Sequence, residues 1–523
     1  MASNNKDINN SILFIIYTLG FLYLIMGINY NINVYDEANA LVGAMRINNG
    51  ELPYRDFWSM YAPGQYYLTA LIRLITSELI YIRIISALMM LGIAISTYKI
   101  SKLLWNNTYS IINYIIIIIL GSEYSLSGRG ILSTILLTVV GLYYLMKHLE
   151  YNANNKSAYI HPIIWGAAIW FRHDFALYLC GSQLIYLFYV LYRREKYLIP
   201  LMQFVIIIAV GSLPYFVLSQ AISVNYIYEQ LVRVPAEVFA DYRNLKYSFP
   251  FADWSDLSEL GIIRYIVAQW KSVIVLIPIA ILTLSGIVVS RNKPEKSKEL
   301  LSYMILTGLC FMMLNQARVR TDIEHVFPSL ILCIMLLPII VSQLKDKLYR
   351  LLALSVFVIF ISVLAFHSKV ESVIQSYNQN GSEYLESKGV RYITIDKQWH
   401  QEYTKTIDWI KFNTLPEDKI FICNEFNDRI TINDMMLYHI SDRLPATKYH
   451  ELHPGIATQP EIQTEIISDL IKNMNKYIVK VSNNYTPEAN KSSQPGSKIM
   501  DQYIMQNYEW KEQFGNYKIY VKK

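Results

Sequence analysis

Long runs of apolar residues dominate the first 367 positions of the chain, and short polar segments separate them. A bilayer core about 30 Å thick requires about 20 apolar residues in one helix. The pattern therefore predicts about eleven membrane-spanning helices, near 11–28, 79–98, 108–121, 127–146, 158–171, 174–192, 199–222, 270–290, 299–315, 326–343 and 349–367. We expect a polytopic α-helical membrane protein, in which 1–367 form the membrane domain and 29–78 form an interfacial first outside loop.

The last part of the chain, 368–523, has a different pattern. Its apolar runs shorten to strand length at 391–396, 419–424 and 477–481. Helical periodicity lies between them, at 398–412, 430–440 and 459–474. Alternating strands and helices are typical of an α/β domain. The sequence thus predicts a soluble C-terminal α/β domain.

Charge between the apolar runs predicts the orientation. With a cytoplasmic N-terminus, every cytoplasmic loop is short and basic, carrying Lys99, Lys102, Lys147, Lys156, Arg193, Arg194, Lys196, Arg291, Lys293, Lys296, Lys298, Lys345, Lys347 and Arg350. Cytoplasmic loops carry an excess of Lys and Arg. The alternate loops are longer or mixed in charge, so we expect a multi-pass protein of the plasma (inner) membrane with its α/β domain outside the cytoplasm.

Composition supports the membrane assignment. Hydrophobic residues make up 53% of the 523 positions and charged residues 17%, against about 25% charged residues in soluble domains. The net charge of +6 is spread over many short loops, which argues against nucleic acid as a partner. The bilayer is the expected partner instead.

The first polar cluster follows the first predicted span. Two adjacent carboxylates, Asp36 and Glu37, come directly after Tyr35. Neighbouring negative charge and partial burial would raise the pKa of one carboxyl group, as a general base requires. A plain solvated loop is the alternative interpretation. Downstream aromatic and charged residues, including Arg55 and Tyr61, are typical of an interfacial segment and could support the loop or an acceptor.

Two further clusters lie in predicted outside loops. The second comprises Arg172, His173 and Asp174, with the basic Arg129 at the outer end of another span. The third contains the charged residues Arg318, Arg320, Asp322, Glu324 and His325. Arginine binds phosphate oxygens bidentately, and ionisable residues at a membrane edge are functional candidates. Simple turns or ion pairs between helices would explain the same residues. No HExxH or repeated DxD pattern indicates a metal site, and no cofactor is predicted, although a divalent metal is not excluded by the pattern.

The sequence resembles the GT-C superfamily of membrane glycosyltransferases, of the protein O-mannosyltransferase and lipid A aminoarabinose-transferase type. The residues that carry the resemblance are Tyr35-Asp36-Glu37, Gly50-Glu-Leu-Pro-Tyr54, Tyr61-Ala-Pro63-Gly64, Arg320-Thr-Asp322, His325 and Pro328. The resemblance covers roughly 10–370. Ala62-Pro63-Gly64 stands where aminoarabinose transferases have a lysine and paired prolines, so lipid A is not supported as the acceptor.

The resemblance implies transfer of a sugar, with inversion, from a polyprenyl-phosphate donor to a hydroxyl of a glycan, lipid or protein acceptor outside the cytoplasm. Asp36 would be the catalytic base, with Glu37 assisting. The donor phosphate would be held by Arg129, Arg172, Arg318, Arg320 and His325. Tyr35, Arg55, Tyr61, His173, Asp174, Asp322 and Glu324 would support the acceptor or the loops.

Three other functions are compatible with a membrane protein of this kind. A transporter or flippase for lipid-linked saccharides would place polar groups near the midplane and contain inverted repeats, whereas the charges here gather at one predicted face. A polysaccharide polymerase or ligase would use a pyrophosphate carrier. A non-catalytic scaffold would not need the outward cluster of charges.

Overall fold

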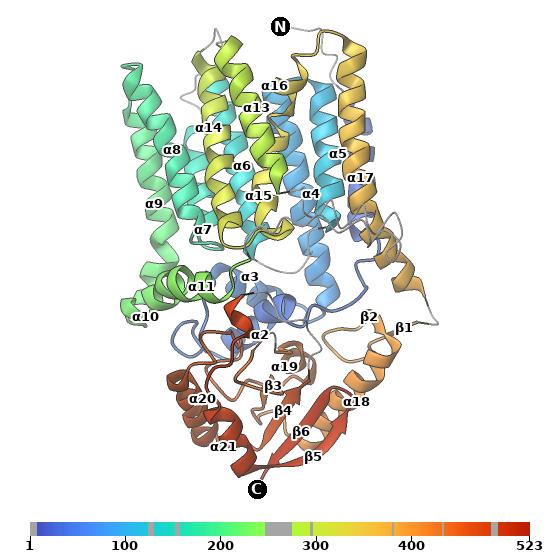
Figure 1. The fold of residues 1–523 in the computed structure, drawn as a ribbon. Helices are drawn as coiled ribbons and strands as arrows, with labels where there is room; N and C mark the ends of the chain where they lie inside the picture. Colours follow the sequence, from blue (N-terminus) through green and yellow to red (C-terminus); the bar gives the residue numbers. More distant parts are fainter. Residues whose placement is uncertain are drawn as a thin grey trace.

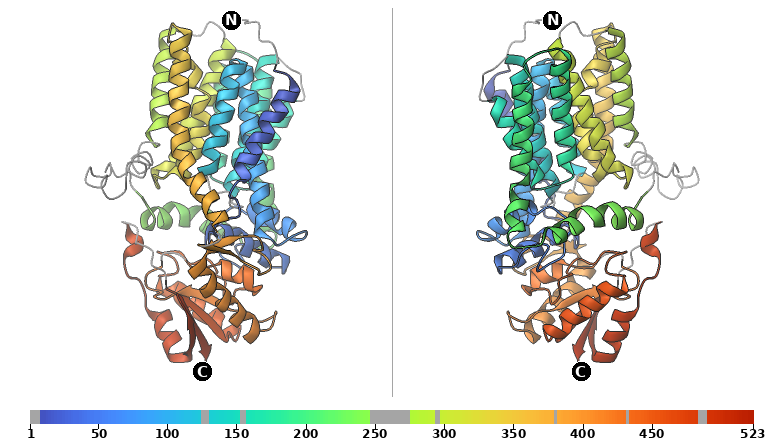
Figure 2. Two further views of the ribbon diagram at one scale, coloured as in Figure 1. Left: turned by 90° about the vertical axis from the view of Figure 1, so that its right-hand side faces the viewer. Right: turned by 90° about the vertical axis from the view of Figure 1, so that its left-hand side faces the viewer.

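The computed structural model describes residues 8–123, 130–151, 157–245, 275–292, 297–378, 381–430, 433–482 and 490–523. These residues form three layers, stacked from one end of the molecule to the other (Figure 1). A bundle of long helices makes up one end, short helices form the middle, and a domain with a β-sheet makes up the other end. The side views in Figure 2 show the same order of layers.

The bundle contains the apolar runs of the sequence. Its helices are α1 (Asn10–Ile25), α4 (Leu79–Leu104), α5 (Asn107–Glu123), α6 (Gly130–Tyr151), α7 (Ser157–Ile169), α8 (Phe175–Tyr192), α9 (Leu198–Ser219), α13 (Leu276–Asn292), α14 (Ser297–Met313), α15 (Ile323–Ile334), α16 (Leu337–Val341) and α17 (Lys347–Tyr377). Each predicted span overlaps at least one of them. Among the described residues, five helices are long and apolar enough to cross a membrane: α4, α6, α8, α9 and α14 with its 3-10 continuation.

Apolar side chains cover the outside of the bundle as well as its interior. On α9, Val205, Phe216 and Val217 are each more than half exposed. Water would penalise such a surface, whereas lipid tails accept it. The mostly helical protein is thus built for a membrane.

Helix boundaries in the bundle follow local polar signals. The Asp346 side chain accepts a hydrogen bond from the Leu348 backbone N–H at the start of α17. The Asp322 side chain does the same for the N–H of His325 at the start of α15. Such caps satisfy donors that the helix leaves unpaired. Helix α17 continues to Tyr377, past the boundary expected at 367.

The middle layer comes from two of the predicted outside loops. Helices α2 (Asp36–Asn48) and α3 (Gly64–Arg73) belong to the loop 29–78. Helices α10 (Val224–Tyr228), η1 (Glu229–Phe239, a π-helix) and α11 (Ala240–Tyr242) follow α9. These helices lie between the bundle and the sheet (Figure 1).

The C-terminal region contains two sheets. Strands β1 (Ser382–Tyr384) and β2 (Thr394–Asp396) form an antiparallel pair. A four-stranded sheet has the order β3-β4-β6-β5, from β3 (Phe421–Asn424), β4 (Tyr477–Val481), β5 (Tyr508–Phe514) and β6 (Tyr517–Lys522). Only β3 and β4 are parallel among these described strands. The helices are α18 (Lys397–Asn413), α19 (Met436–Ser441), α20 (Pro460–Lys472), α21 (Ile499–Asn507) and the 3-10 turn η3 (Lys491–Ser493).

The segment 29–78 and the C-terminal region share one hydrophobic core. Ala38, Leu41 and Val42 of α2 pack in the same cluster as Ile395 and Tyr438. The backbone N–H of Met435 also donates to the carbonyl of Val34 at 3.1 Å. Burying this shared apolar surface attaches the α/β region to the middle layer.

Candidate functional site

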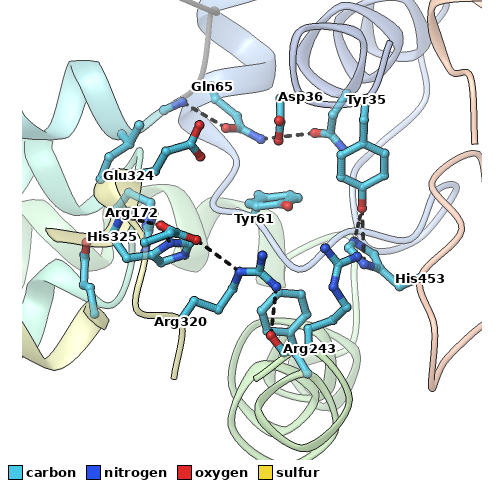
Figure 3. A pocket seen from close by; sticks show the side chains of 16 residues that line it. Tyr35, Asp36, Tyr61, Gln65, Arg172, Arg243, Arg320, Glu324, His325 and His453 are labelled. Atoms are coloured by element: carbon cyan, nitrogen blue, oxygen red, sulfur yellow. Dashed lines mark hydrogen bonds and ion pairs between the residues drawn. The ribbon is translucent and has the colours of Figure 1, made fainter. Parts of the chain in front are cut away.

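A cavity of about 220 Å³ lies where the three layers meet. Figure 3 shows its lining side chains. They come from α2, α3, α6, η1 and α15, from the segments before α3, after α7, after α11 and between α14 and α15, and from the C-terminal region. The cavity is lined by Tyr35, Asp36, Asn39, Tyr61, Gln65, Gly130, Ile131, Arg172, Phe239, Arg243, Gln316, Arg320, Asp322, Glu324, His325 and His453. All three clusters predicted from the sequence therefore contribute to one cavity.

Asp36 begins helix α2 and faces this cavity. Asn33, three residues earlier, holds it in place. The Asn33 amide donates to Asp36 Oδ2 at 3.0 Å, while Asn33 Oδ1 accepts from the Asp36 backbone N–H at 2.7 Å. The positive end of the helix dipole favours an ionised carboxylate at this position.

Glu37 lies outside the cavity, although it is the neighbour of Asp36. Arg83 of α4 donates to both of its carboxylate oxygens at 2.7 Å, and both side chains are buried. Consecutive residues of a helix point in different directions, about 100° apart. The two acids therefore have different surroundings: one meets the cavity and the other forms a buried ion pair.

Three arginines line the opposite part of the cavity: Arg172, Arg243 and Arg320. Arg172 donates to Asp174 at 2.9 and 2.7 Å, and this forked pair fixes its guanidinium. The Arg320 guanidinium donates to the carbonyl of Arg243 at 2.8 Å. The backbone of Leu245 pairs with Val319 and Thr321, and this pairing brings the two arginines together.

Asp322 and His325 form a hydrogen-bonded pair beside the arginines. His325 Nδ1 lies 2.6 Å from Asp322 Oδ1. Burial acts to raise the pKa of the Asp322 carboxyl, but the bonds from His325 and the charge of Arg320 outweigh it and hold that pKa below its ordinary value. Asp322 is therefore ionised at neutral pH.

The C-terminal region supplies the remaining wall. Glu451 is fully buried behind the cavity and accepts from Tyr35 Oη at 2.7 Å and from Asn39 Nδ2 at 2.6 Å. The same Glu451 oxygen that Tyr35 contacts lies 2.6 Å from His453 Nε2. Burial, together with the charge of Glu451, raises the pKa of Tyr35 well above its ordinary value. Tyr35 is therefore a neutral hydrogen-bond donor at physiological pH.

Several predicted site residues lie away from the cavity. Arg318 is exposed and contacts Asn315. Arg55 pairs with Asp56 at the surface. His173 lines a separate apolar groove. Asp174 supports Arg172 from behind, and Arg129 lies outside the described residues.

Eight lining residues were not among the predicted site residues: Asn39, Gln65, Gly130, Ile131, Phe239, Arg243, Gln316 and His453. Asn39 follows Asp36 by three positions, so helical spacing could have placed it on the same face. Gln65 Oε1 accepts from the Gly130 backbone N–H at 3.0 Å, a contact between distant segments. Arg243 and His453 lie in segments that read as plain loops, and no local signal marks them.

In the part of the chain that the structure describes, no group of three or more His, Cys, Asp or Glu side chains is placed to hold a metal ion. Two acids that line the cavity are instead engaged by other side chains: Asp36 by the Asn33 amide and Asp322 by His325. The described residues thus form no fitted metal site.

Comparison of sequences finds no matching family model and no matching curated protein. Comparison of structures does find matches. An oligosaccharyltransferase from Archaeoglobus fulgidus superposes with a TM-score of 0.52 at 11% identity, covering 89% of this chain and 68% of the other. ArnT from Cupriavidus metallidurans superposes with a TM-score of 0.52 at 10% identity, covering 98% of this chain and 97% of the other.

Both of these neighbours are GT-C glycosyltransferases. The match to ArnT extends over nearly the full length of both chains, so it includes the helical bundle and the C-terminal region. The resemblance drawn from the motifs in the sequence is confirmed at the level of the fold. The chain has the fold of the GT-C membrane glycosyltransferases.

Proposed function

We propose that the protein is an inverting glycosyltransferase, which moves a sugar from a polyprenyl-phosphate donor to an acceptor hydroxyl at the outer face of the plasma membrane. One observation carries the proposal: a carboxylate in the first turn of α2, Asp36, lines the same cavity as Arg172, Arg243 and Arg320. A base and a group of fixed cations are the two elements that a single displacement at a sugar phosphate requires.

In the proposed reaction, the acceptor oxygen attacks the anomeric carbon while the bond from that carbon to the phosphate oxygen breaks. Asp36 takes the proton of the acceptor hydroxyl. The electron pair of the broken bond stays on the phosphate, whose growing charge the arginines stabilise. A single displacement inverts the anomeric centre. Glu37 takes no part in proton transfer and positions α2 through Arg83.

The donor lipid has a suitable path to this cavity. An apolar groove of about 370 Å³ runs between α7, α8, α9 and η1, and His173 lies on it. The neighbouring Arg172 lines the cavity, so a lipid tail in the groove would bring its phosphate to the arginines. The Archaeoglobus fulgidus neighbour was also solved with a dolichol-phosphate, a lipid of this class.

The proposal includes the topology predicted from the charged loops. All eleven predicted spans would cross the plasma membrane, with the N-terminus cytoplasmic and the region 368–523 outside. The cavity then lies at the outer interface, where a lipid phosphate and an extracytoplasmic acceptor meet. A reporter fused to the C-terminus would test this orientation, and activity of a cytoplasmic reporter there would refute it.

The decisive experiment is a transfer assay with purified protein and radiolabelled polyprenyl-phosphate sugars. Asp36→Asn is expected to lower transfer by about 10²- to 10⁴-fold, the range for loss of a general base. Donor binding should remain. Asp408→Asn, an exposed acid of α18, is the matched control. Transfer by Asp36→Asn at the wild-type rate would exclude the assigned base, and no transfer with any donor would refute the function.

A further inference from the structure

A second cavity, of about 450 Å³, lies between the first outside segment and the C-terminal region. Residues 30–34 provide one side, through Tyr30, Asn31, Ile32 and Val34. The other side comes from the C-terminal region and includes Asp396, Trp399, Asp434, Asn516 and Tyr517. Among the described residues, the two cavities have no lining residue in common.

The position of this cavity in the α/β fold is typical of a ligand site. Val481 and Ser482 line it at the carboxyl end of β4, which pairs in parallel with β3. In α/β sheets, ligands bind outside the carboxyl ends of the parallel strands. Its volume also falls in the range of roughly 300–1,000 Å³ found for small-molecule sites.

The aromatic and acidic groups of the cavity are held in place by a chain of hydrogen bonds. Trp399 Nε1 donates to Tyr517 Oη at 2.9 Å. Tyr517 in turn donates to Asp434 Oδ2 at 3.1 Å. Asp434 is only 2% exposed, and its other oxygen accepts from the Met436 backbone N–H. A ligand would therefore meet rings that are already ordered, which lowers the entropic cost of binding.

The chemistry of the lining indicates the class of ligand. Within the described residues, the lining contains no Lys, Arg or His, so phosphate and other anions find no cation there. The polar groups offer many acceptor oxygens: two carboxyl groups, two carboxamides and three hydroxyls. Such acceptors suit a neutral ligand that carries several O–H donors, and aromatic rings suit one with an apolar C–H surface. A saccharide unit has both properties.

We infer that this second cavity binds a neutral sugar unit of the acceptor or product glycan; the choice of a sugar rests on the proposed glycosyl transfer. The chain connects the cavity directly to the reaction site. Residues 30–34 line the sugar cavity, and Tyr35 and Asp36, which follow immediately, line the candidate active site. A glycan whose sugar unit binds in the second cavity is thereby recognised beside the segment that carries Asp36, the proposed base.

Binding of neutral sugars to the full-length protein tests this inference without any donor lipid. Saturation-transfer NMR with glucose, galactose, mannose and N-acetylglucosamine is expected to detect at least one ligand. Trp399→Ala should raise the Kd of that ligand about tenfold, which is the effect of losing one aromatic contact. Trp510→Ala is the matched control, because Trp510 lies on β5 and is 59% exposed.

Two further variants separate the possible outcomes. Asn516→Ala changes an exposed turn residue of the lining and should also weaken sugar binding. It therefore tests the inference independently if Trp399→Ala does not fold. Asp36→Asn should bind sugar like the wild type, so this result does not depend on whether transfer occurs. Three results would overturn the inference. They are binding of none of the four sugars, equal weakening of sugar binding by Trp510→Ala, and binding of choline in place of the sugars, since an organic cation would also suit aromatic and acidic groups.

Discussion

Glu451 provides the most direct test of whether the C-terminal region takes part in the reaction. It lies behind the cavity wall and accepts hydrogen bonds from Tyr35 and Asn39, while His453 contacts it at 2.6 Å. Glu451→Gln preserves the size of the side chain but replaces one accepting oxygen with an NH2 group. At least one buried donor therefore loses its acceptor.

The size of the effect follows from the number of bonds lost. A hydrogen bond to a charged group contributes about 1.5–3 kcal/mol, and a buried donor without an acceptor costs about 1–3 kcal/mol. Loss of one such bond is thus expected to cost roughly 2 kcal/mol. Because this bond holds Tyr35 beside Asp36, we expect the lost energy to raise the barrier of the reaction. The value of kcat should then fall about 10- to 100-fold, since each tenfold corresponds to about 1.36 kcal/mol.

The assay is steady-state transfer, with kcat and KM measured separately and thermal unfolding followed in parallel. Tyr35→Phe should cost much less in the Glu451→Gln background than in the wild type, because the two changes remove the same bond. Glu417→Gln, an exposed glutamate of the same region, serves as the control. Additive effects of Tyr35→Phe and Glu451→Gln, or an unchanged kcat in Glu451→Gln, would refute the reasoning.

Three further predictions concern stability and donor binding. Arg83→Ala leaves Glu37 buried without its partner, so unfolding should become easier by about 3–5 kcal/mol; a melting temperature equal to the wild type would contradict this. Burial raises the pKa of Asp434 from 3.8 to about 7, so the folded state keeps a proton that the unfolded chain releases, and stability falls as pH rises from 4 to 7. Asp434→Asn should therefore raise the melting temperature at pH 8 by removing a penalty of roughly 4 kcal/mol, with little change at pH 4; equal shifts at both pH values would exclude this explanation. Arg320→Ala should lower kcat/KM for the donor about 10- to 100-fold by removing a charged contact, whereas the exposed Arg318→Ala should not, and equal losses in both variants would remove the distinction between them.

The sequence alone was sufficient to locate the helices of the bundle and strands β2, β3 and β4 of the C-terminal region. Apolar runs of bilayer length and strand-length alternation are local properties, and α4 and β4 appear where those patterns placed them. The hairpin of β5 and β6 was not predicted. Strand β5 alternates weakly, because most of its residues are exposed and few of its positions need to be apolar.

The residues of the candidate site also fall into two groups: those that the sequence could identify and those that it could not. Asp36, Arg172 and Arg320 could be selected from the sequence because they lie in clusters of ionisable residues beside apolar runs, where such residues are functional candidates. Glu37 and Arg318 carry similar local signals, but the structure directs them elsewhere: one into a buried ion pair with Arg83, the other to the surface. Helical spacing fixes which residues share a face. Which face meets the cavity depends on what packs against the helix or loop, and sequence spacing does not contain that information.

Tertiary structure alone identified Arg243 and His453, and it joined the C-terminal region to the cavity. These residues reach the site through contacts between segments hundreds of positions apart, such as the Tyr35–Glu451 hydrogen bond. Local sequence patterns indicate which positions are buried and which charged residues lie near the lipid. Which distant loops share a cavity is decided by the packing of the layers, because only the folded chain sets the distances on which hydrogen bonds and ion pairs depend.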